Sequence, residues 1–148
     1  MTKVDHETRS TRIRLHKPDE FEGMRKAGRL AAEALDVLIE AAQPGVTTAT
    51  LDRLCVEFAR DHKAIPATAG YRGYRYSICT SINHVVCHGM PSDKPLLEGD
   101  IVNIDVTLIV DGWYGDTSRM ANIGPVPRKA ERLVEITHEC LMRGIAAV

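Results

Sequence analysis

The sequence predicts a single domain of the α/β (α+β) class, in which helices cover an antiparallel sheet. Two segments after Pro18 repeat apolar residues at helical spacing, whereas residues 101–110 alternate apolar and polar residues as a half-buried strand does. The dipeptide Asp111-Gly112 follows that strand directly and predicts a hairpin turn. A chain of 148 residues has the length of one ordinary domain and can bury a core.

The first predicted helix follows a polar tail, residues 1–17, which mixes charges of both signs without periodicity. From Pro18 onwards apolar residues recur every three or four positions, and Pro44-Gly45 ends this helix. Thr47 and Thr48 are N-cap candidates for a second helix. The inner stripe of the second helix is predicted to comprise Leu51, Leu54, Cys55, Phe58 and His62.

The chain after Pro66 is richer in Gly, Tyr and β-branched residues. GYRGYR is typical of a loop, YSICTSI alternates like a strand, and INHVVCHGMP predicts an irregular turn. IVNIDVTLIV carries the strongest strand signal, and WYGDTSRM is predicted to return beside it. GPVP separates this hairpin from a last helix, predicted over residues 129–148.

Composition argues against several classes of function. The 19 basic and 20 acidic residues give a net charge of −1, which does not suit a surface for nucleic acid or an anionic membrane. No apolar run approaches the ~20 residues needed to cross a bilayer, and the N-terminus has no apolar signal-peptide core. The four cysteines form no CxxC pair, which indicates free thiols and a cytoplasmic protein.

Asp105 and Asp116 are the strongest candidates for metal ligands. A two-residue turn places Asp105 opposite Ser118 and Asp116 opposite Thr107, so both carboxylates lie on one face of the hairpin. Their Cα atoms are then roughly 7–8 Å apart. Carboxylates so placed can each reach a pair of metal ions about 3.5–4 Å apart. Oxygen ligands suit divalent ions such as Co, Mn, Fe or Zn.

The alternative is that both aspartates are solvated on the wet side of a hairpin. Three features favour a metal site. Asp105 interrupts a strand of high β-propensity, Gly115 permits close backbone approach beside Asp116, and Thr107 and Ser118 offer hydroxyls on the same face. A one-residue change in the turn would send the aspartates to opposite faces. Two carboxylates cannot complete a two-metal site, so further ligands must come from elsewhere.

His88 is the candidate catalytic and substrate-binding histidine. It lies in VVCHGMP, where Gly89 and Pro91 impose an irregular path. An imidazole there can donate a hydrogen bond to a substrate carbonyl or to the oxyanion formed in acyl transfer. The alternative is a loop histidine bonded to nearby backbone. His84 is expected to face solvent.

A second group of candidates lies just upstream. Tyr71, Tyr74 and Cys79 suit a pocket for an apolar, sulfur-containing side chain, although such residues often serve packing alone. Cys79 and Cys87 are not expected to be protease nucleophiles, because Cys87 and the adjacent His88 would point to opposite faces of a strand. GYRG matches no phosphate-binding loop, so nucleotide binding is not predicted.

From Pro18 to its end the sequence resembles the type I methionine aminopeptidases. The matching stretches are MRKAGRLAAEALD, QPGVTTATLDRLC, GYRGYRYSICTSINHVVCHGMP, EGDIVNIDVTLIVDGWYGDTSRM and ERLVEIT. The order SIN..VCHG.P, GD.VNIDVT, GDTS is highly specific. Proline-specific peptidases share the fold and the two aspartates of that family, but they carry different sequence around them.

The resemblance implies a role for each candidate. Asp105 would bind one metal ion through both oxygens, and Asp116 would bridge two divalent metal ions. His88 would hydrogen-bond the scissile peptide. The pocket for the initiator methionine side chain would be lined by Tyr71, Tyr74 and Cys79.

The resemblance also implies an activity. Members of this family remove the initiator methionine from nascent polypeptides when the second residue is small. The implied partners are nascent N-termini, with the ribosome as a place of encounter, and not nucleic acid or membrane. The complete enzyme is expected to be a cytoplasmic monomer.

The resemblance covers only part of the family's domain, which consists of two similar halves in a pita-bread arrangement. Residues 18–148 correspond to the N-terminal half, and no position matches the remaining ligands, a histidine and two glutamates. One of those glutamates is the usual candidate general base. We therefore expect this chain alone to be inactive, to bind metal weakly, and to self-associate through its unpaired sheet edge. The alternatives are a non-catalytic half-domain binding module and a proline-directed metallopeptidase of the same fold.

Overall fold

The computed structural model describes residue 13 and residues 15–148. Most of the predicted polar tail, residues 1–17, therefore lies outside the described residues. The helices are α1 (Phe21–Ala41), α2 (Thr48–Asp61) and α3 (Arg128–Ala146), with one 3₁₀ turn, η1 (Tyr71–Gly73). The strands are β1 (Ile65–Pro66), β2 (Ile78–Ile82), β3 (Ile101–Val110) and β4 (Trp113–Asn122). The sequence did not predict β1, which is too short to show a period.

Strand β3 is the centre of an antiparallel sheet. It pairs with β4 along one edge and with β1 and β2 along the other. Val110 pairs with Trp113, so the β3–β4 turn consists of Asp111 and Gly112, whose φ angles of 51° and 83° both lie in the left-handed region. The predicted two-residue hairpin is confirmed, and with it the register on which the placement of Asp105 and Asp116 depends.

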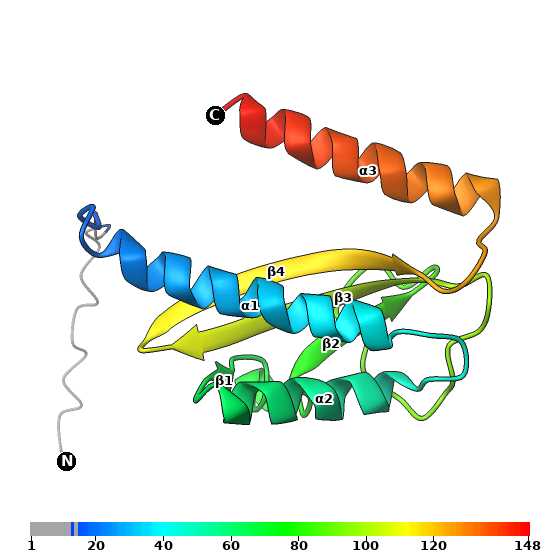
Figure 1. Cartoon of the computed structure of the whole chain (residues 1–148), viewed down its shortest axis with the longest axis horizontal. Coiled ribbons are helices and arrows are strands. Elements are labelled where there is room, and N and C mark those ends of the chain that lie inside the picture. The colour runs from blue at the N-terminus through cyan, green and yellow to red at the C-terminus, as the bar shows by residue number, and fades with distance from the viewer. Residues whose placement is uncertain (1–12, 14) are drawn as a thin grey trace, which may run out of the picture.

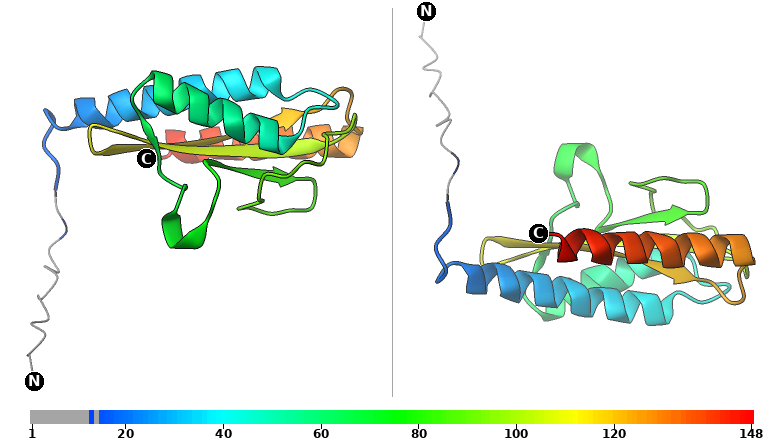
Figure 2. Two further views of the ribbon diagram at one scale, coloured as in Figure 1. Left: turned by 90° about the horizontal axis from the view of Figure 1, so that it is seen from below. Right: turned by 90° about the horizontal axis from the view of Figure 1, so that it is seen from above.

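Helices α1 and α2 lie on one face of the sheet, and the chain around η1 lies on the other side of the strands (Figures 1 and 2). The alternation in β3 explains this arrangement, because every second side chain, from Val102 to Val110, is apolar and points toward the two helices. The fully buried side chains of β3 are Val102, Ile104, Val106 and Leu108. They pack into one core with buried residues of both helices, including Leu35, Leu38, Leu51 and Cys55. The predicted α+β class is confirmed. We call this side of the sheet the closed face and the opposite side the open face.

A glycine sets the distance between α1 and β4. A Cβ atom on Gly115 would lie 2.1 Å from the backbone oxygen of Ala27, which no real side chain tolerates. The absence of a side chain at Gly115 therefore lets the helix backbone rest directly on the strand. The close backbone approach predicted at Gly115 is confirmed, but it is made to helix α1 on the closed face and not on the side of Asp116.

The start of α2 is as predicted and its end is not. The Thr47 hydroxyl accepts a hydrogen bond from the backbone N–H of Thr50 at 3.2 Å, which confirms Thr47 as the N-cap. His62 was predicted on the buried stripe of this helix, but the helix ends at Asp61 and His62 is exposed. Its ring instead stacks on that of Phe58, with 4.1 Å between centroids.

Helix α3 stands apart from the core. It runs beyond the β4 side of the sheet, and none of its residues, all of which the structure describes, is buried (Figure 1). Its apolar side chains are exposed, with Leu133, Leu141 and Ile145 each about 60% accessible. Among the described residues, no helix, α3 included, is both long enough and apolar enough to span a membrane.

Candidate metal centre

The two candidate metal ligands lie on the open face, on neighbouring strands. Asp105 of β3 pairs with Ser118, and Asp116 of β4 pairs with Thr107, as predicted. The carboxylates are therefore diagonal neighbours on one side of the hairpin. Asp105 is half-buried and Asp116 is exposed. The Thr107 hydroxyl donates a hydrogen bond to Oδ1 of Asp116 at 2.9 Å, which orients that carboxylate.

The charges around Asp105 show that the candidate groups act on one another. Burial raises the pKa of Asp105, the negative charge of Asp116 raises it further, and His88 acts in the opposite direction and lowers it. The two carboxylates thus repel each other in a partly desolvated place. A divalent cation between them would relieve that repulsion, and carboxylate oxygens are suitable ligands for such an ion.

These two carboxylates form only part of a metal site. Within the described part of the chain, no three side chains of the His, Cys, Asp or Glu types are arranged so that they could hold one ion. The donor chemistry of Asp105 and Asp116 fits a divalent metal, but the number of donors does not complete its coordination.

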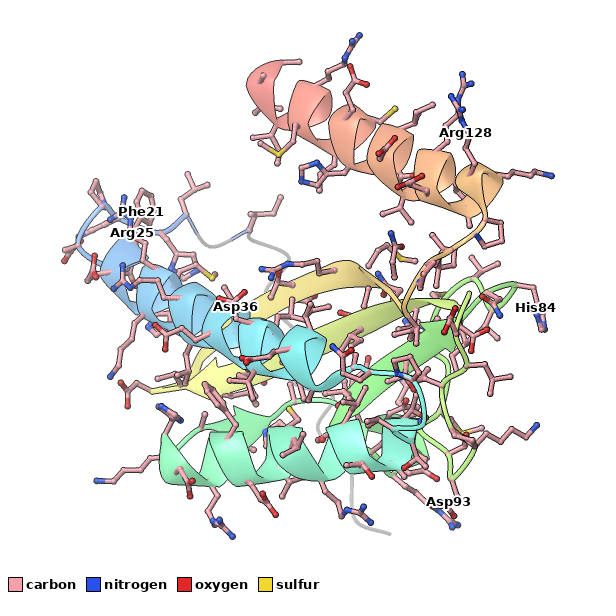
Figure 3. All side chains as sticks on the ribbon, turned by 45° about the vertical axis from the view of Figure 1, so that its right-hand side comes forward. Phe21, Arg25, Asp36, His84, Asp93 and Arg128 are labelled. Carbon is pink, nitrogen blue, oxygen red and sulfur yellow. The ribbon has the colours of Figure 1, made fainter. Side chains whose placement is uncertain are left out.

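His88 comes to this site on a loop. Its φ of 55° places it in the left-handed region, which is unusual for a residue with a side chain. The next residue, Gly89, is held against β2, because its carbonyl accepts a hydrogen bond from the Thr80 N–H at 2.8 Å. His84, at the start of the same loop, is exposed and points away from the protein, as predicted (Figure 3).

The predicted pocket residues are only partly brought together. Cys79 is 6% exposed and is the direct cross-strand partner of Asp105. Burial raises the pKa of its thiol, and the negative charge of Asp105 adds to that shift. The Tyr74 hydroxyl donates toward the carbonyl oxygens of Ile78 at 3.0 Å and Gly89 at 3.2 Å. Tyr71 is 64% exposed, and its ring faces the Arg72 guanidinium.

Ser81 was not predicted from the sequence as a residue of this site. It pairs with Asn103 and so points to the open face, yet it is 4% exposed because the Gly89 backbone lies over it. The Ser81 hydroxyl accepts a hydrogen bond from the Gly89 N–H at 3.1 Å. The sequence carries no local sign of this contact, since the two residues meet only through the return of the loop.

Comparison with protein families gives one match over most of the chain. Residues 22–148 match the metallopeptidase family M24. The chain is 56% identical over 136 residues to a methionine aminopeptidase of Rickettsia prowazekii (strain Madrid E), in an alignment that covers 92% of this chain and 52% of the relative. It is 49% identical over 138 residues to a methionine aminopeptidase of Escherichia coli (strain K12), again with 92% and 52% covered.

The same likeness is found among solved structures. The crystal structure of methionine aminopeptidase from Rickettsia prowazekii superimposes with a TM-score of 0.88 at 56% identity. The superposition covers 90% of this chain and 54% of that one. The chain therefore spans about half the length of the curated relatives it matches.

Proposed function

Because this chain belongs to metallopeptidase family M24, we propose that it forms the N-terminal half of a methionine aminopeptidase and contributes Asp105 and Asp116 to its metal site. Its fold is that of the pita-bread domain of methionine aminopeptidases, over about half of that domain. The proposed reaction is the removal of the initiator methionine from nascent proteins whose second residue is small. The proposed location is the cytoplasm.

The observation that carries this proposal is the geometry of the β3–β4 hairpin. Asp105 and Asp116 share the open face, and the Thr107 hydroxyl orients the carboxylate of Asp116. The two carboxylates are close enough that the charge of Asp116 raises the pKa of Asp105. In the proposed site both aspartates hold divalent ions, which when bound would activate a water molecule and polarise the scissile carbonyl. His88 would hydrogen-bond the substrate peptide, while Cys79, Tyr74 and Tyr71 would line the methionine pocket.

Two carboxylates do not suffice for this reaction, so the proposal includes a dependence on further ligands. The 148-residue chain alone should bind metal weakly and hydrolyse no peptide above background. Activity of the purified chain, lost on Asp116→Ala, would contradict that dependence.

The first test is metal binding by the 148-residue chain, measured by titration calorimetry with Mn²⁺ and Co²⁺. Binding should be weak in the natural chain and absent in Asp105→Asn and Asp116→Asn. Asp93→Asn is the matched control, because it removes an exposed carboxylate from a surface loop well outside the hairpin (Figure 3). Equal binding by all four proteins would rule out the proposed ligands.

The second test is the reaction itself. Residues 1–148 are joined to the half of the Rickettsia prowazekii relative that this chain does not match. The proposal predicts release of methionine from Met-Ala peptides, lost on Asp116→Ala. Cleavage of Xaa-Pro peptides in its place would identify a proline-directed peptidase. No cleavage, with metal binding intact, would favour a non-catalytic binding module.

A further inference from the structure

The loop formed by residues 83–90 folds back over the open side of β2. Two hydrogen bonds made by the backbone of Gly89 hold it there. The Thr80 N–H donates to the Gly89 carbonyl at 2.8 Å, and the Gly89 N–H donates to the Ser81 hydroxyl at 3.1 Å. A Cβ atom on Gly89 would lie 2.1 Å from the Thr80 carbonyl oxygen, so the loop lies as close to the strand as a backbone can.

A third contact comes from η1 and the segment after it. The Tyr74 hydroxyl lies 3.2 Å from the same Gly89 carbonyl and 3.0 Å from the Ile78 carbonyl. Burial, together with the neighbouring Cys79, raises the pKa of Tyr74, so its hydroxyl keeps the proton that it donates. The backbone N–H and C=O of Gly89 are therefore both engaged, by side chains or backbone of two different segments.

His88 directly precedes this anchored glycine. Its left-handed backbone, with φ of 55°, costs free energy for a residue with a Cβ and persists only where the surroundings enforce it. Free of such contacts, the segment would relax toward commoner conformations and carry the imidazole away from Asp105. The hydrogen bonds of Gly89, the next residue, hold the backbone of His88 in this conformation.

We propose that Ser81, supported by the Tyr74 hydroxyl, is a positioning residue that holds His88 beside Asp105 through the backbone of Gly89. This inference rests on the proposed function, in which His88 faces the substrate. Ser81 acts as an acceptor and touches no substrate. It explains why a serine occupies the open face of β2 at a point where the loop removes it from water.

The first experiment uses the metal-free 148-residue chain and nuclear magnetic resonance. Amide exchange at Gly89 should speed up about tenfold in Ser81→Ala, because the Gly89 N–H loses its acceptor. Ser81→Thr, which keeps the hydroxyl, should restore the slow exchange. Ser118→Ala is the control, since it removes the hydroxyl of an exposed serine on β4. Residual dipolar couplings of the His88 and Gly89 amides should change in Ser81→Ala and Tyr74→Phe and be restored in Ser81→Thr.

The second experiment adds trace Mn²⁺ and measures paramagnetic broadening of the His88 ring protons relative to the Asp105 amide. In the natural chain both should broaden. In Ser81→Ala the broadening of His88 should fall several-fold, while that of Asp105 persists. Faster exchange at Gly89 with unchanged couplings and unchanged broadening at His88 would overturn the proposal, because Ser81 would then serve stability alone.

The two proposals fail in different ways. Absence of broadening around Asp105 and Asp116 in the natural chain would contradict the proposed metal site. The dipolar couplings, which need no metal, would still decide whether Ser81 positions His88.

Discussion

The two faces of the β3–β4 hairpin are formed by alternate residues of the same two strands, yet they differ in polarity, burial and charge. On β3 the closed face is apolar and buried under α1 and α2, and on β4 a helix backbone rests on Gly115. Only Arg119 of β4 reaches past the helix to solvent, where it pairs with Asp36 of α1. The open face is partly exposed to solvent and carries Asp105 and Asp116, whose negative charges repel each other. Since a strand alternates its side chains, one backbone can serve both purposes without conflict.

This contrast indicates a division of labour between the faces. Free energy of folding comes from the closed face, and the capacity to bind a cation comes from the open face. Substitutions on the closed face should therefore lower stability, and substitutions on the open face should change metal binding. Neighbouring residues of one strand should differ sharply in how much their substitution lowers the free energy of unfolding.

The largest difference is expected between adjacent residues of β3. Leu108 is fully buried on the closed face, whereas Ile109 is only partly buried on the open face. Leu108→Ala should lower the free energy of unfolding by about 2–5 kcal/mol, because it removes buried methyl groups and leaves a cavity. Ile109→Ala removes a side chain of the same size and should cost less than half as much. Urea denaturation of both variants measures this, and similar losses would refute the proposed division.

The contact between α1 and β4 gives the next largest effect. Gly115→Ala should destabilise by about 1–3 kcal/mol, because the added Cβ meets the Ala27 carbonyl and forces the helix away. Gly28→Ala is the matched control in α1, where a Cβ would meet nothing within 4 Å. That control should stabilise by about 0.5–1 kcal/mol, through the lower backbone entropy of the unfolded chain. Changes of the same sign in thermal unfolding would contradict the close-packing argument.

The closed face also contains a buried polar group, the hydroxyl of Thr80. The Thr80 hydroxyl is buried and, among the described residues, has no hydrogen-bond partner. Thr80→Val should therefore stabilise the fold by about 1 kcal/mol, since it removes an unpaired buried hydroxyl and keeps the branched shape. Ser77→Ala should do the opposite, because the Ser77 hydroxyl donates to the Asp52 carboxylate at 2.6 Å. Destabilisation by Thr80→Val would indicate that the hydroxyl has a partner.

The parts of this molecule that the sequence predicted are those with local causes. Helical periodicity located α1 and α2, and a two-residue turn determined the register that brings Asp105 and Asp116 to one face. That register needed no knowledge of the rest of the fold, because the parity of a tight hairpin settles which side each residue takes.

The missed features depend on contacts between distant segments. Ser81 and Gly89 meet only because the loop returns to β2, and the close contact of Gly115 is with a helix far away in sequence. His62 was misplaced because periodicity cannot tell where a helix ends, and the chain leaves the helix one residue earlier. The roles of His88, Tyr71, Tyr74 and Cys79 remain predictions.

The smallest effect on stability is the most informative about the open face. Burial and the charge of Asp116 raise the pKa of Asp105 above its ordinary value, so the folded state disfavours the ionised carboxylate. That penalty is fully present above the folded pKa and disappears as the pH falls through it toward the ordinary value of about 3.9. Asp105→Asn should therefore raise the free energy of unfolding at pH about 7, and this gain should vanish near pH 3.5. Solvent screening at a half-exposed group keeps it below about 1 kcal/mol.

Metal should reverse the order of the two proteins. A cation that binds only the folded state stabilises it in proportion to the logarithm of its concentration over the dissociation constant. At millimolar Mn²⁺ the natural chain should gain melting temperature while Asp105→Asn gains none, and Asp93→Asn should respond as the natural chain does. A carboxylate that destabilises the fold without metal and stabilises it with metal is a ligand of that metal. If Asp105→Asn stays the more stable protein at every Mn²⁺ concentration, the open face is only a wet surface.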